Sequence, residues 1–120
     1  MSVRAVRGAT QLEADTREQM LDRVAELVLA VMDANGLEVD DFISVVFTAT
    51  GDLHAEFPAY AARQLGFDDV PLICARELDI VGGKPRTIRI LMHLYTERTR
   101  AELHHVYLEG ATTLRDDLPE

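Results

Sequence analysis

The sequence is short of cysteine, of lysine, of positive charge and of long apolar runs. Its single cysteine, Cys74, excludes an intrachain disulfide and a metal site built from several cysteines, and suits a reducing compartment. The beginning MSVRAVRGA lacks the apolar stretch of a signal peptide, and no run approaches the roughly 20 apolar residues that span a bilayer. We therefore expect a cytoplasmic protein without a membrane segment.

The charge balance excludes further partners. The chain has 12 basic and 21 acidic residues and a net charge of −9. Nucleic acids and anionic lipids attract basic proteins, so neither is an expected partner. Only Lys84 is a lysine and the other eleven basic residues are arginines. Arginine makes forked contacts with carboxylates and phosphates, although a GC-rich genome produces the same bias without any function.

The first half of the chain predicts two strands around a long helix. The 120 residues, of which 48% are hydrophobic, fit a single globular domain over 1–120. Residues 2–7 alternate as a short strand that Gly8 ends, and residues 16–35 have helical spacing between a cap at Asp15 or Thr16 and a stop at Gly36. Residues 42–50 are nearly all apolar and predict a strand buried on both faces.

The second half predicts a short helix and three more strands. Pro58 suits the start of a helix that Gly66 ends, and strands are expected over 70–75, 86–96 and 105–108, before an irregular acidic tail. In the longest of them Ile88, Ile90 and Met92 share one face. The fold class is therefore α+β, with a mixed sheet of about five strands and two main helices. Such a sheet covers only part of its surface, which favours association with copies of itself.

Polar side chains recur near the strand ends and on the short helix. They are Arg7, Arg63, Glu77, Arg89, Tyr107 and Arg115. One interpretation is an internal ion network of Arg7, Glu77 and Arg89 that satisfies its own charges. The other is a site with more arginines than acids, which calls for an anionic ligand such as a small carboxylate or phosphate.

Other chemistries find little support. The run Gly82-Gly83-Lys84 lacks the spacing of a phosphate-binding loop. The four histidines have no metal-binding spacing, so no metal site is expected. Cys74 has no pattern that activates a nucleophile, and a buried or hydrogen-bonding thiol is expected there.

An ordered set of motifs resembles the monofunctional chorismate mutases of the AroH type. The matching stretches are VRAVRGAT, TATGDLHAEFPAYAARQLG, VPLICARELDIVGG, IRILMHLYT and HHVYLEGATTLRDDL, and they cover nearly the whole chain. The resemblance implies a homotrimeric pseudo-α/β-barrel with active sites between subunits. It implies an isomerase that rearranges chorismate to prephenate in aromatic amino-acid biosynthesis (the shikimate pathway), with no cofactor.

The resemblance also implies roles for particular residues. Arg89 is expected to face the breaking ether oxygen, Arg7 to bind a carboxylate beside Tyr107, and Glu77 to accept a hydrogen bond from the ring hydroxyl near Cys74. Arg63 and Arg115 are expected at the rim. The expected catalytic residues are Arg7, Cys74, Glu77, Arg89 and Tyr107. The expected substrate-binding residues are these five with Phe57, Ala59, Arg63, Leu114 and Arg115.

Two departures and two alternatives accompany this interpretation. The family often has lysine where this chain has Tyr60, and threonine where it has Ile73. The first removes a rim charge and the second a hydroxyl near the ligand. Imine- and enamine-hydrolysing deaminases share the trimeric architecture, but their motifs are absent. A non-catalytic carboxylate-binding module would be favoured by loss of Glu77 or Arg89, and both are present.

Overall fold

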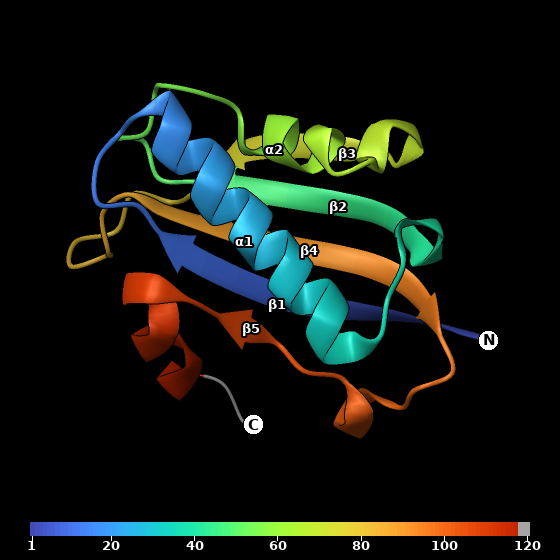
Figure 1. The fold of residues 1–120 in the computed structure, drawn as a ribbon. Helices are drawn as coiled ribbons and strands as arrows, with labels where there is room; N and C mark the ends of the chain where they lie inside the picture. Colours follow the sequence, from blue (N-terminus) through green and yellow to red (C-terminus); the bar gives the residue numbers. More distant parts are fainter. Residues whose placement is uncertain (118–120) are drawn as a thin grey trace.

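The computed structural model describes residues 1–117, and for 115–117 the backbone alone. Five strands form one mixed sheet in the order β3-β2-β4-β1-β5 (Figure 1). The strands are β1 (Ser2–Gln11), β2 (Phe42–Ala49), β3 (Leu72–Arg76), β4 (Thr87–Thr96) and β5 (Val106–Tyr107). Strand β4 is antiparallel to β1 and β2, whereas β3 runs parallel to β2 and β5 parallel to β1. Prediction and structure agree on a mixed α+β sheet.

Two helices lie on one side of this sheet: α1 (Arg17–Asn35) crosses the strands and α2 (Pro58–Gln64) lies beside β3 (Figure 1). The Thr16 side chain accepts the backbone N–H of Gln19 at the start of α1, and Gly36 ends the helix with φ +62°. The buried side of α1 carries residues at helical spacing: Met20, Val24, Leu27, Val28 and Val31. Short 3₁₀ segments connect the elements: η1 (Val39–Asp41), η2 (Phe67–Asp69), η3 (Arg100–Glu102) and η4 (Glu109–Asp117).

Alternation along β4 places the core. The even positions, Ile88, Ile90, Met92 and Leu94, are at most 3% exposed and pack beneath the helices. The odd positions of the same strand, such as Arg89 and Leu91, lie on the opposite face of the sheet. The expected division of this strand into two faces is therefore confirmed.

The sheet face opposite the helices, which we call the open face, exposes large apolar side chains. Val3 is 58% exposed, Ile73 62%, Leu91 37% and Tyr95 46%. The expectation that residues 42–50 are buried on both faces is wrong for a single chain, because β2 has only three buried positions, Phe42, Val45 and Phe47, and its other residues are half-buried. A patch of this kind on a small protein is typical of an interaction surface.

Two local predictions need correction. Gly8 does not end the first strand, since β1 continues to Gln11. A Cβ atom at position 8 would lie 3.0 Å from the Val106 carbonyl oxygen and 3.2 Å from Leu27, so the glycine permits a close approach and makes no turn. The acidic tail, expected to be irregular, forms η4 over Glu109–Asp117. No helix in the described part of the chain is long and apolar enough to cross a membrane.

Candidate active site

An arginine–glutamate pair occupies one end of the open face. The Nε of Arg89 lies 2.9 Å from Oε1 of Glu77, and the hydroxyl of Thr48 donates to Oε2 of the same carboxylate at 3.2 Å. The Glu77 side chain is 15% exposed and that of Arg89 48%. Because Glu77 uses only one of the five N–H donors of a guanidinium, Arg89 keeps donors for a second anion.

Arg7 lies on the same face as Arg89, on the neighbouring strand. The register pairs Ala9 with Arg89 and Arg7 with Leu91, so the two arginines lie two residues apart along adjacent antiparallel strands. The backbone N–H of Arg7 donates to Nδ1 of His105 at 2.9 Å, and the side chain of Arg7 is exposed. Among the residues that the structure describes, no ion pair joins Arg7 to Glu77. The internal network of three residues therefore reduces to the Glu77–Arg89 pair.

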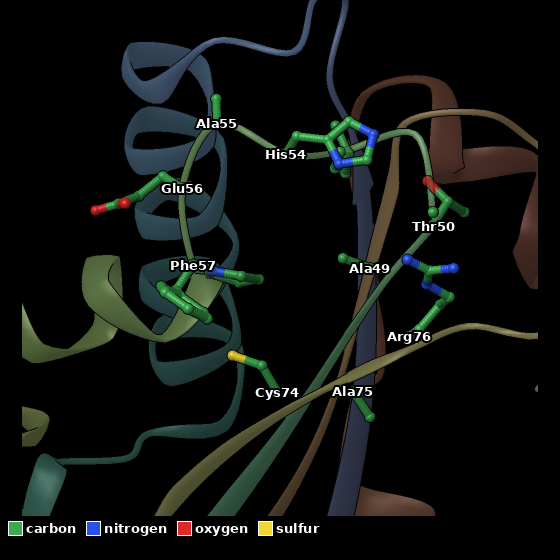
Figure 2. Close-up of a pocket in the computed structure, with 12 residues that line it drawn as sticks. Ala49, Thr50, His54, Ala55, Glu56, Phe57, Cys74, Ala75 and Arg76 are labelled. Atoms are coloured by element: carbon green, nitrogen blue, oxygen red, sulfur yellow. The ribbon is translucent and has the colours of Figure 1, made fainter.

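A second group of candidate residues lies where α2 meets β3. Phe57 and Cys74 line a cavity of about 310 Å³, and Figure 2 shows the Cys74 sulfur directed toward the Phe57 ring. The Phe57 side chain is 69% exposed, whereas Ala59, two residues further on, is 4% exposed. Arg63, on the last turn of α2, is exposed.

The two groups of residues line different cavities. Glu77 and Arg89 border a larger cavity of about 910 Å³ that includes neither Phe57 nor Cys74. Arg76 borders both cavities, and its guanidinium lies over the backbone of Gly51, where a Cβ would be 3.7 Å away. The sequence interpretation missed Arg76. Its position in the chain between two candidate residues, Cys74 and Glu77, could have indicated that it lies near the site.

The remaining candidates lie at the other edge of the sheet. Tyr107 is half-buried on β5, where it pairs with Ala9, and Leu114 is half-buried in η4. The backbone of Arg115 belongs to η4, but its side chain lies outside the described residues. Register therefore places Tyr107 beside the strand that carries Arg7.

Two aspartates that the sequence interpretation also missed hold the loops around the cavities. Asp15 accepts the backbone N–H groups of His54 and Ala55, each at 3.0 Å. Asp52 accepts the Thr50 hydroxyl at 2.6 Å and the backbone N–H of Arg86 at 3.0 Å. Both carboxylates fasten the loop between β2 and α2, which carries Phe57, to distant parts of the chain.

The environment of Asp52 lowers its pKa. Burial alone would raise the pKa, but the hydrogen bonds from Thr50 and from the Arg86 backbone favour the carboxylate and outweigh it. Asp52 therefore contributes stability above the ordinary aspartate pKa of about 3.9, and this contribution is lost as the pH falls through the lower pKa of the folded state.

We expect Asp52→Asn to lower the free energy of unfolding at pH 7 by about 1 kcal/mol, allowing for the carboxylate's exposure to solvent. The difference from the unsubstituted protein should shrink as the pH falls through the lowered pKa of the folded state, below which the carboxylate is protonated in both states. Urea denaturation over a pH series measures this. Asp22→Asn, at an exposed position on α1, is the matched control. An equal loss from the two variants, or a loss independent of pH, would contradict the role assigned to Asp52.

The site suits an organic anion more than a metal. The described residues contain no cluster of three or more His, Cys, Asp or Glu side chains able to hold a metal ion. They do place two arginines against one glutamate on an exposed sheet face. Fold and site thus define a small α+β protein whose arginine-bearing sheet face suits an anionic organic ligand.

Comparisons with known proteins identify the family. The family profile described as chorismate mutase type I matches residues 3–118. A curated relative, chorismate mutase AroH of Bacillus subtilis, is 40% identical over 98% of this chain and 94% of its own length. Chorismate mutase AroH of Thermus thermophilus is 44% identical over 97% of this chain and 96% of its own. The chain belongs to the type I chorismate mutase family.

A solved structure agrees with the sequence comparisons. A chorismate mutase from Clostridium thermocellum superimposes with a TM-score of 0.90 at 40% identity, over 92% of this chain and 98% of the other. The predicted family, fold class and enzyme class, an isomerase of aromatic amino-acid biosynthesis, are thereby confirmed. The residue roles and the trimer remain predictions.

Proposed function

We propose that the chorismate mutase reaction of this protein, the rearrangement of chorismate to prephenate, takes place in clefts that neighbouring copies of a homotrimer complete. The observation that carries the proposal is the Arg89–Glu77 pair on the open face, with Arg7 on the adjoining strand. A chain of the type I chorismate mutase family that keeps these groups has the charges its substrate requires.

The substrate is a dianion, so two carboxylates need partners. Arg7 and Arg89 lie two residues apart on adjacent strands, and together they outnumber Glu77. The net charge of −9 does not oppose binding, because physiological salt screens long-range repulsion over about 8–10 Å. Arg7 is proposed to hold one carboxylate, with Tyr107 beside it, while Arg89 contacts the other.

The reaction is a one-step pericyclic shift without covalent or acid–base catalysis. The protein therefore has two tasks: to select the compact conformer of chorismate and to stabilise the charge that develops when the ether C–O bond breaks. Arg89 is proposed to direct a donor at the ether oxygen as it becomes negative. Glu77 holds this guanidinium in position through its own contact at 2.9 Å.

The other groups surround the ring. Glu77 is proposed to accept a hydrogen bond from the ring hydroxyl and to balance positive charge on the ring, with the Cys74 thiol nearby. Phe57 supplies an apolar wall, which fits its 69% exposure in a single chain. Ala59 and Leu114 complete the packing surface, and Arg63 and Arg115 recruit substrate at the rim.

Association of copies accounts for two features together. One chain divides its candidate residues between separate cavities, and its open face exposes apolar side chains such as Leu91. Packing the open faces together buries that surface and allows the Phe57–Cys74 group of one copy to face the Arg7–Arg89 group of another. A homotrimer that needs no cofactor and works in the cytoplasm completes the proposal.

The assay follows chorismate consumption and prephenate formation by the purified protein, with its mass measured by light scattering. We expect turnover far above the spontaneous reaction and the mass of three chains. Chorismate consumption at the spontaneous rate would refute the enzymatic activity. A monomeric mass with full turnover would refute active sites formed between neighbouring copies.

A further inference from the structure

A basic cavity lies at the outer edge of β1, and its lining includes neither Arg7 nor Arg89. Its volume is about 330 Å³. Strand β5 pairs with β1 only at Gly8 and Ala9, and the segment between β4 and β5 runs beside the earlier part of β1 (Figure 1). The cavity is formed between that part of β1, β4 and the segment containing η3.

The lining of this cavity is positively charged and includes no acid. Its polar residues are Arg4, His93, Arg100 and His105, and the rest of the lining is apolar. This is unexpected in a chain with a net charge of −9. The acids nearest in sequence are already engaged, since Glu97 lies 3.3 Å from the N-terminal amine and Glu102 accepts the backbone N–H of Thr99.

The two arginines lack counter-charges. Among the described residues, neither the Arg4 nor the Arg100 guanidinium has a hydrogen-bond or ion-pair partner. The Nε of Arg4 is buried without an acceptor, which costs free energy. The ring of His93 is held by Ser44, whose hydroxyl lies 3.3 Å from Nδ1.

We propose that this cavity binds a small oxyanion, a phosphate or a carboxylate, between Arg4 and Arg100. An anion there pairs with the Arg4 and Arg100 guanidinium groups, which have no counter-charge among the described residues, and offsets the repulsion between them. The cavity volume suits an ion or a small metabolite. The lining includes neither Arg7 nor Arg89, although His105 accepts the backbone N–H of Arg7 and Val3 belongs to the open face. The binding proposed here does not depend on the proposed reaction.

The test uses the full protein with ¹³C-labelled histidine and follows the ring signals of His93 and His105 by NMR. Inorganic phosphate is added at constant pH, with chloride at equal ionic strength as the reference. We expect saturable shifts of both rings with phosphate and none with chloride. Arg100→Gln should weaken the apparent affinity about tenfold or more, through loss of a charge-assisted contact.

Two further variants separate the possible origins of the shifts. Arg17→Gln removes an equal charge from an exposed position on α1 and should leave the phosphate response unchanged. Arg89→Ala removes one of the two proposed active-site cations and should also leave it unchanged. If Arg89→Ala abolished the shifts, the anion would belong to the active site and the proposal would be wrong.

Filling of the cavity by a neighbouring copy would give a different result. In that case phosphate would produce no saturable shift, and Arg100→Gln would reduce the assembly mass in light scattering. Either that pattern, or shifts that Arg100→Gln leaves intact, would overturn the proposal. Failure of chorismate turnover would leave it standing.

Discussion

Replacing Arg89 by alanine should lower kcat for chorismate by about 10³-fold or more while the protein stays folded. Removing one preorganised donor from a site of developing negative charge typically costs 10²–10³-fold, and Arg89 carries a full charge as well as a donor. The position tolerates the change structurally, because the side chain is 48% exposed and pairs with Glu77 at the surface. Steady-state kinetics and circular dichroism together measure both parts of this prediction.

A second variant tests geometry apart from charge. Arg89→Lys keeps the cation but loses the planar fork, so it should recover little of the lost kcat. Arg17→Ala removes an exposed arginine that pairs with Glu56 at 3.7 Å and should behave as the unsubstituted protein does. Near-normal kcat in Arg89→Ala would mean that the charge-stabilising role belongs to another residue.

Replacing Leu91 by aspartate should dissociate the assembly and remove most of the activity. Leu91 is 37% exposed at the centre of the open face, two residues along β4 from Arg89. An unpaired carboxylate buried between copies costs several kcal/mol, and each 1.4 kcal/mol weakens association about tenfold. We expect a folded monomer and a fall in turnover per chain of about 100-fold or more at micromolar protein.

The matched control uses the same substitution on the helical side. Leu29, on the outer side of α1, is 49% exposed and lies across the sheet from the open face. Leu29→Asp should therefore leave both mass and turnover unchanged. If Leu91→Asp stayed trimeric and active while folded, the open face would not be the contact between copies. Light scattering and turnover at one protein concentration decide this.

The fold was predictable where periodicity is strong. The alternation at Ile88, Ile90 and Met92 located the core face of β4, and the capping signals located α1 within a residue. Gly8 misled because a glycine also serves where backbones and side chains approach closely, and only the packing of Val106 and Leu27 reveals which role applies. Burial of β2 on both faces was expected but is not found in a single chain, because one face of this strand belongs to the open face.

The candidate site was predictable in part. Arg7, Glu77 and Arg89 stand out as charges within or beside apolar strands, and the structure brings them to one face. Asp15 and Asp52 give no comparable signal, because each acts by fastening a loop to residues more than 30 positions away. The position of Arg76 between two cavities follows from the three-dimensional structure and not from the local sequence pattern. Such roles depend on how loops meet in space, which local pattern does not encode.

The central claim is that each active site combines residues from two copies, and subunit mixing tests it most directly. Arg89→Ala disables one group of residues. Phe57→Glu disables the other by placing a carboxylate beside a dianion, at a position exposed enough to tolerate the change. Each variant alone should be inactive. Co-expressed in equal amounts, they form trimers in which about a quarter of the sites have both partners intact, so about a quarter of full turnover should return. Mixed trimers that form, as shown by differently tagged chains, and yet remain inactive would contradict the claim.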